Sequence, residues 1–259
     1  MIDINYRINI LGCPIDNLTL KQTIDLIDKF IKSKKPHQHV VVNADKLLKV
    51  RKDNKLKDII GKCDIINADG MAIVWASKII GKPLKQRVAG IDLMQILAEH
   101  AIIKNYRLYF LGAKQEIITK VVAIYKKKYP ELQIVGFKNG YWKPEAENDV
   151  INSILLAKPD ILFVAISSPK KEYFLKKYLD ILKVPFVMGV GGSFDVVAGL
   201  TKRAPKCMQR IGLEWLWRFI QEPGRLWKRY LIGNVIFIWV VIKEFIKIRI
   251  LKKAEVEQK

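Results

Sequence analysis

The feature that most constrains the fold is a regular alternation of short apolar runs with helix-length segments. Six runs have the composition of buried strands, at residues 39–44, 63–68, 106–112, 132–137, 160–166 and 185–190. Several are continuously apolar, which is typical of strands covered on both faces. Helix-length segments lie between them, at residues 70–80, 91–104, 115–128, 145–157 and 170–182. This order predicts a Rossmann-like α/β fold, with a mainly parallel sheet, helices on both faces and right-handed crossovers.

Glycines and polar residues stand where the predicted strands end. In a parallel α/β sheet the ligand crevice lies beyond the carboxyl ends of the strands. The residues at these ends are Asn43, Asp69, Gly112, Ser167–Ser168 and Gly191–Gly192. We therefore expect them to gather along one rim of the sheet.

Asp69 lies at the junction of a predicted buried strand and the predicted helix 70–80. An aspartate in this position most often caps the helix by accepting hydrogen bonds from its first amides. It can also act as a functional carboxylate in the crevice. Residue types alone favour the cap.

Two other turns have the composition of anion sites. The stretch VMGVGGSFD (187–195) brings glycines to a strand end, where backbone amides can approach a phosphate, although a tight packing turn explains it equally well. In ISSPKKE (166–172), Pro169 is expected at the first helical position, with either an anion site or a simple cap by Ser168. The glycine turn at 189–192 lacks the G-x-G-x-x-G spacing of a dinucleotide-binding fold, and the strand that follows the turn at Gly112 does not end in an acidic residue. Both observations disfavour a nicotinamide-dependent enzyme.

The formal net charge of +21 indicates an anionic partner, unless it only reflects a lysine-rich surface. The three cysteines form no CxxC pair, so a disulfide scaffold or zinc site is not expected and a reducing cytosol fits. No Asp-x-Asp pair is present to hold a metal-bound nucleotide diphosphate, and no signal peptide is expected.

The composition changes after about residue 200. Residues 201–230 carry eight Lys or Arg against two Glu, interleaved with Trp215, Trp217, Trp227 and Tyr230. The longest uncharged apolar run that follows, 235–242, is far short of the roughly 20 residues of a spanning helix. We predict an α/β domain at 1–200 and a helical appendage at 201–259, broken near Pro223, that lies in the membrane interface. The alternative is a helical subdomain whose aromatic residues form ordinary core.

Six ordered motifs resemble those of the WecG/TagA/CpsF glycosyltransferases and span about residues 8 to 235. They are NADGMAIVWASKIIGKPLKQRVAGIDLM (67–94), FLGAK (110–114), VGFKNGYW (135–142), SPKKE (168–172), GVGGSFDVVAGLTKRAP (189–205) and GLEWLWRFIQEPGRLWKRYL (212–231).

The resemblance implies an inverting, metal-independent transferase without a cofactor. Its donor would be a UDP-sugar, with N-acetylmannosamine in the best-known branch, and its acceptor a polyprenyl-diphosphate-linked N-acetylglucosamine of cell-envelope polymers such as teichoic acids. A C-terminal appendage would dock the cytoplasmic enzyme on the anionic inner leaflet and help to close the active site.

The resemblance also assigns roles to residues. Asp69 would be the general base that deprotonates the acceptor hydroxyl. The donor pocket would include Val41, Asn43, Arg87, Lys171, Gly191 and Gly192. The diphosphate and acceptor site would include Arg218, Arg225, Lys228 and Arg229, with Arg87 also near a diphosphate.

Three positions depart from the family pattern. Val41 replaces a threonine, Lys171 a glutamine, and Lys228 an arginine. Lys171 suggests a uronic acid donor, unless its ammonium faces solvent or contacts phosphate. UDP-glucose as donor and a non-catalytic scaffold for envelope assembly are alternatives. A nucleic-acid-binding protein is disfavoured because no helix-turn-helix, zinc or RNA-binding signature is present. Self-association that covers the apolar tail stays open.

Overall fold

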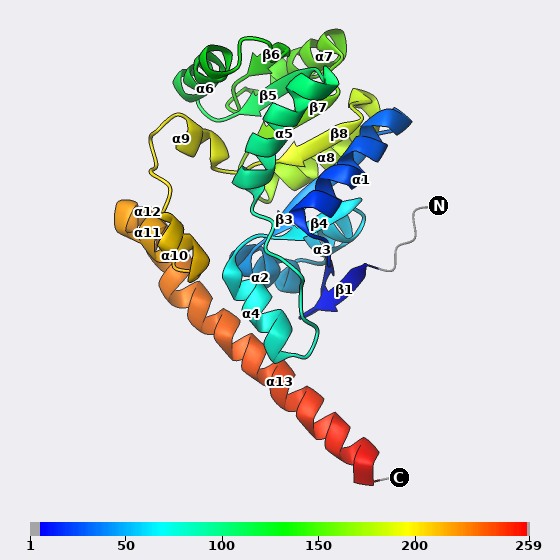
Figure 1. Cartoon of the computed structure of the whole chain (residues 1–259), viewed down its shortest axis with the longest axis vertical. Coiled ribbons are helices and arrows are strands. Elements are labelled where there is room, and N and C mark those ends of the chain that lie inside the picture. Colours follow the sequence, from blue (N-terminus) through cyan, green and yellow to red (C-terminus); the bar gives the residue numbers. More distant parts are fainter. Residues whose placement is uncertain (1–5, 258–259) are drawn as a thin grey trace.

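The computed structural model describes residues 6–257 of the chain. Its centre is a sheet in the order β4-β3-β8-β7-β5-β6, with parallel pairing throughout. The strands are β3 (His37–Val42), β4 (Ile65–Ala68), β5 (Leu108–Gly112), β6 (Ile134–Lys138), β7 (Ile161–Ala165) and β8 (Phe186–Gly189). All six predicted strands are present, and the predicted Rossmann-like α/β fold is confirmed (Figure 1).

The five predicted helices are also present. They are α4 (Met71–Ile79), α5 (Gly90–Lys104), α6 (Gln115–Lys128), α7 (Glu147–Ala157) and α8 (Lys170–Leu182), and a 3₁₀ turn (Pro144–Ala146) precedes α7. Both faces of the sheet are covered. Phe110 of β5 packs in one core cluster with α5 and α6, whereas its neighbours Tyr109 and Leu111 pack in another with α7 and α8. Two buried faces account for the uninterrupted apolar runs.

The N-terminal elements have no counterpart among the predicted strands and helices. An antiparallel hairpin of β1 (Arg7–Ile10) and β2 (Cys13–Asp16) precedes α1 (Leu20–Ser33). Two more helices, α2 (Ala44–Lys52) and α3 (Asn54–Gly61), fill the crossover between β3 and β4. Strand β3 ends at Val42 because Asn43 caps α2, its Oδ1 accepting from the Lys46 amide at 3.0 Å.

The C-terminal region is helical, as predicted. It comprises α9 (Ser193–Val197), α10 (Lys206–Arg210), α11 (Glu214–Gln221), α12 (Pro223–Trp227), a π-helical turn η2 (Lys228–Ile232) and α13 (Gly233–Glu257). The chain breaks at Glu222 and Pro223 begins α12, which confirms the expected interruption. Some appendage aromatics do form core, since the Tyr230 ring lies 5.7 Å from Trp215 and 6.4 Å from Phe219. The domain boundary at residue 200 stays a prediction.

Helix α13 runs along the α/β domain beside α2 and α4 and then extends beyond it (Figure 1). Phe237 and Val241 are buried in the core cluster that α2, α3 and α4 form with the N-terminal hairpin. Within residues 6–257, no helix combines the length and the apolar character that crossing a bilayer requires.

Candidate active site

A cavity of about 1170 Å³ opens at the carboxyl ends of the central strands, between the sheet and the appendage. Its walls include the predicted rim residues Asn43, Asp69, Ser167, Ser168, Gly191 and Gly192. Gly112 is not part of the lining, although its neighbour Ala113 is. The other wall comes from α11, η2 and α13, so the appendage completes the cavity.

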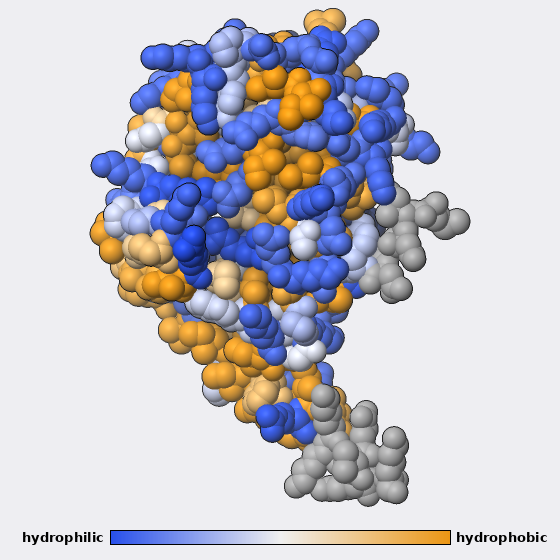
Figure 2. All heavy atoms as spheres, in the orientation of Figure 1, coloured by the Kyte–Doolittle hydropathy of each residue, from blue (hydrophilic) through white to orange (hydrophobic). Residues whose placement is uncertain are grey.

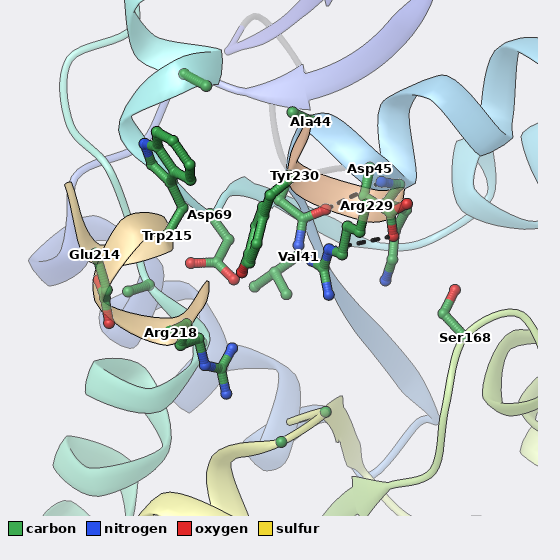
Figure 3. Close-up of a pocket in the computed structure, with 18 of the residues that line it drawn as sticks. Val41, Ala44, Asp45, Asp69, Ser168, Glu214, Trp215, Arg218, Arg229 and Tyr230 are labelled. Carbon is green, nitrogen blue, oxygen red and sulfur yellow. Dashed lines mark hydrogen bonds and ion pairs between the residues drawn. The ribbon is translucent and has the colours of Figure 1, made fainter. Parts of the chain in front are cut away.

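Asp69 is not a helix cap. Gly70 occupies the cap position of α4, and no side chain makes a capping hydrogen bond there. Gly70 adopts φ +105°, a conformation that directs the chain sharply from β4 into the helix and suits glycine. Among the described residues, no group is hydrogen-bonded to the Asp69 carboxylate, while its amide donates to Val42 O at 2.8 Å. Figure 3 shows this carboxylate pointing into the cavity on the same side as Arg218 and Tyr230.

The surroundings of Asp69 raise the pKa of its carboxyl above the ordinary 3.8. The main cause is loss of hydration, because burial disfavours the charged form. The Arg87 guanidinium opposes this rise, Glu214 adds to it, and Arg218 and Arg229 oppose it more weakly. Asp69 is therefore a carboxylate of increased proton affinity that is open to a ligand.

Arg87 belongs to a network of four charged residues beside Asp69. Its Nη2 donates to Glu214 Oε2 at 2.9 Å. Arg203 donates two hydrogen bonds to the Asp92 carboxylate, at 2.5 and 2.8 Å, and its Nε lies 3.7 Å from Glu214 Oε1. The network joins α5 to α11 and so holds the appendage against the rim of the sheet. Arg203 was missed as a site residue, although it stands within the quoted motif at 189–205.

Three predicted appendage arginines line the cavity, namely Arg218, Arg225 and Arg229. A Cβ at Gly192 would lie 3.0 Å from Arg218 Nη2, so the glycine turn leaves room for this guanidinium. Arg225 pairs with Glu222, and Arg229 Nε lies 3.7 Å from Asp45 Oδ2.

Lys228 is not brought together with these arginines. Its side chain is exposed, and its ammonium lies 5.4 Å from the centre of the Trp227 ring, away from the cavity lining.

Lys171 is buried rather than solvent-facing, which corrects one of the expectations for it. The residue is only 3 % exposed, although it contributes to the cavity lining, and its Nζ lies 3.2 Å from Glu172 Oε1, an atom that also accepts from Lys46 Nζ at 2.8 Å. Burial lowers the pKa of Lys171 to about 8, and repulsion from Lys46 adds to this. A Cβ at Gly189 would lie 2.5 Å from Lys171 Cε, so the small strand end makes space for the lysine.

The remaining donor-side predictions have mixed outcomes. Val41 and Asn43 both line the cavity, but Asn43 Oδ1 is occupied as the cap of α2. Pro169 holds the cap position of α8 and Lys170 is its first residue, so the expected first helical position for Pro169 and the alternative of a cap by Ser168 are both wrong. Ser168 Oγ is buried, with no hydrogen-bond partner among the described residues.

Asp195 is a cavity residue that the sequence analysis did not single out. It is half-buried, and loss of hydration raises the pKa of its carboxyl, with Arg225 acting in the opposite direction. It is the last residue of GVGGSFD (189–195), a stretch that was interpreted from its glycines alone. Across residues 6–257, no three His, Cys, Asp or Glu side chains are grouped so as to hold a metal ion.

The family model for the glycosyl transferase WecG/TagA/CpsF family matches residues 8–250. The chain belongs to this family. It is a glycosyltransferase, and the resemblance found in its motifs is confirmed.

Its relatives in this WecG/TagA/CpsF family include three proteins with one name, N-acetylglucosaminyldiphosphoundecaprenol N-acetyl-beta-D-mannosaminyltransferase. The one from Bacillus spizizenii is 36 % identical over 192 residues, 74 % of each chain. The Bacillus subtilis protein is 35 % identical over 84 % of each chain, and the Staphylococcus aureus protein 30 % identical over 94 % of this chain and 95 % of its own. Individual site residues stay predictions.

Proposed function

We propose that this glycosyltransferase moves N-acetylmannosamine from UDP to N-acetylglucosaminyl-diphosphoundecaprenol, with inversion at the anomeric carbon. The names of the relatives support the sugar and the acceptor. The observation that carries the mechanism is the Asp69 carboxylate, which faces the cavity with no protein hydrogen-bond partner among the described residues and has arginines around it.

Asp69 acts as the general base. Inversion requires the acceptor oxygen to attack the anomeric carbon from the face opposite UDP, while a carboxylate takes the hydroxyl proton. The raised pKa makes Asp69 a stronger base than an exposed aspartate, while the Arg87 guanidinium opposes the rise and favours the charged form that a base requires. Gly70 and the amide bond to Val42 fix the carboxylate at the rim.

Arginines of the appendage stabilise the diphosphate groups. Breaking the bond to UDP develops negative charge on the leaving oxygen, and guanidinium groups offer several donors to phosphate. Arg218, Arg225 and Arg229 all line the cavity from the appendage side. We propose that they allow transfer without a metal ion, which predicts unchanged activity in excess EDTA.

The contacts of Lys171 favour a neutral donor sugar. Its ammonium already has a carboxylate partner in Glu172, and the pair is buried in the protein. A uronic acid donor would compete with Glu172 for the same charge. Comparison of UDP-N-acetylmannosamine, UDP-N-acetylmannosaminuronate and UDP-glucose as donors decides among the three candidates.

We also propose that α13 and the end of η2 bind the anionic inner leaflet through an outer stripe of exposed side chains, defined as Ile232 of η2 and Ile236, Trp239, Ile246 and Ile250 of α13. Lys243 and Lys247 are exposed on the same helix and suit anionic headgroups. Figure 2 shows the hydrophobic surface along α13, in contrast to the many hydrophilic side chains over the α/β part. Sedimentation with anionic vesicles in excess DNA tests this contact against general attraction to polyanions.

The decisive experiment for the proposed reaction is a transfer assay with a short-chain prenyl-diphosphate-GlcNAc acceptor. The Asp69→Asn variant should lose turnover by about 10²–10⁴-fold while still binding the UDP-sugar. Undiminished turnover in this variant would exclude Asp69 as the base. No transfer to this acceptor with any UDP-sugar would exclude the proposed reaction itself.

A further inference from the structure

The cavity does not end at the arginines but continues into an apolar groove between α4 and α13. We call it the prenyl groove and define it by Trp75, Ile79, Val235, Ile238, Ile242 and Phe245, all of which line the cavity. Trp75 is 43 % exposed, Ile79 51 % and Ile238 56 %, so each of these side chains presents apolar surface to solvent.

Helix α13 carries three sets of apolar side chains. Phe237 and Val241 are buried against the α/β domain. Val235, Ile238, Ile242 and Phe245 recur at intervals of three and four residues and so share a second face, which lines the groove. The outer stripe borders this second face, since Ile246 follows Ile242 by about one helical turn, but none of its side chains lines the cavity. The groove is therefore distinct from the surface proposed to meet the membrane.

The chemistry of the lining changes in one direction along both helices. Asp69 lies two residues before the first residue of α4, and Trp75 and Ile79 follow along that helix. Arg229 lies in η2, and Val235 and the later groove residues follow along α13. Figure 1 shows α4 beside the first part of α13, and the two helices are in contact. The cavity thus passes from a carboxylate, through guanidinium groups, to apolar side chains.

We infer that the prenyl groove binds the first isoprene units of the lipid acceptor. This inference rests on the proposed function, because it deepens the description of the same acceptor. An acceptor with sugar, diphosphate and prenyl chain in sequence matches the order of base, arginines and groove. From Val235 to Phe245 the helix rises about 15 Å, which is long enough for a few isoprene units.

The polyprenyl chain is a better occupant than a second copy of the protein or the bilayer itself. The groove is continuous with the catalytic cavity, so whatever fills it approaches Asp69 and the arginines. A covalently attached prenyl chain brings its diphosphate to the arginines and its N-acetylglucosamine to Asp69, whereas a protein partner or a bilayer lipid carries no sugar acceptor to the base. The acceptor of the relatives carries an undecaprenol.

Acceptor analogues of different chain length test the inference. GlcNAc diphosphates esterified to isopentenyl, geranyl and farnesyl alcohols are compared as monomers in solution, without membrane or detergent. We expect KM to fall with each added isoprene unit, and Ile238→Gln to raise KM for the farnesyl acceptor about tenfold, with little effect on the isopentenyl acceptor.

Two further variants identify the occupant. Ile103→Gln alters an isoleucine of α5 that is 74 % exposed and outside the cavity, and serves as the matched control. Ile246→Gln alters the outer stripe and should reduce vesicle binding without changing the chain-length dependence. A KM that does not depend on chain length in the parent protein overturns the inference. So does an equal increase in KM for the farnesyl acceptor in Ile238→Gln and Ile246→Gln. Self-association that Ile238→Gln abolishes, without chain-length dependence, assigns the groove to a second copy.

A binding measurement separates this inference from the proposed function. If the parent transfers no sugar to any acceptor, the proposed function fails, and the groove is judged from farnesyl diphosphate and isopentenyl diphosphate binding by calorimetry. Tighter binding of farnesyl diphosphate that is lost in Ile238→Gln supports the groove. Equal binding of the two diphosphates rejects it. Circular dichroism checks that each variant is folded.

Discussion

Removal of one buried carboxylate should destabilise the protein strongly. Glu172 is fully buried, and its Oε1 accepts from Lys46 at 2.8 Å and lies 3.2 Å from Lys171. Both lysines are less than a tenth exposed and border the cavity only with that small area, so water can replace little of their contact with the carboxylate. Glu172→Gln would leave two buried ammonium groups without a counter-charge. Loss of one partner of a buried ion pair costs about 3–5 kcal/mol, and we expect a decrease of that size in the free energy of unfolding.

Urea unfolding of a double-mutant cycle measures this cost. Lys171→Gln alone should cost little, because Glu172 keeps its contact with Lys46. Combined with Glu172→Gln, it should recover about 1–2 kcal/mol, because one buried cation is removed together with its partner. If Glu172→Gln lowers the free energy of unfolding by less than about 1 kcal/mol, the lysines are not confined as described, and the reasoning fails.

The pH dependence supplies a second readout for the same cluster. Lys171 has a pKa of about 8 in the folded protein, below its ordinary 10.5. The unfolded chain therefore binds more protons between these values, and the free energy of unfolding should rise as pH increases from about 8 to 10.5. Lys171→Gln should remove that part of the rise.

Three other predictions concern the catalytic rim. Because the pKa of Asp69 is raised, kcat/KM should decrease as the pH is lowered through an apparent pKa that lies above 3.8. A decrease that begins only at or below pH 3.8 would contradict the loss of hydration at this carboxyl. Gly70→Ala should lower the free energy of unfolding by about 1–2 kcal/mol from backbone strain alone, since a Cβ there meets nothing within 4 Å; an unchanged urea midpoint would contradict the φ of +105°. Asp92→Asn weakens the contact with Arg203, so limited proteolysis of the appendage should become faster while UDP-sugar binding persists; an unchanged cleavage rate would show that the network does not hold the appendage.

Local patterns determined much of this protein. Uninterrupted apolar runs predicted strands with two buried faces, and strand ends located the rim that holds Asp69 and Asn43. The break at Pro223 followed from the missing amide and fixed φ of proline. Helix α1 was missed although its signal is local, since Thr19 and Gln22 form a capping box in the sequence Thr-Leu-Lys-Gln.

The tertiary structure alone decided what the ionisable side chains contact. Lys46 and Glu172 are 126 positions apart, and Arg87 and Glu214 are 127 apart, so no local pattern pairs them. Residue types favoured Asp69 as a cap. The structure instead places Gly70 at the cap position and the Asp69 side chain in the cavity lining. Hydrophobic periodicity acts over a few residues and sets elements and faces, whereas charge pairing and pKa depend on which distant elements the fold packs together.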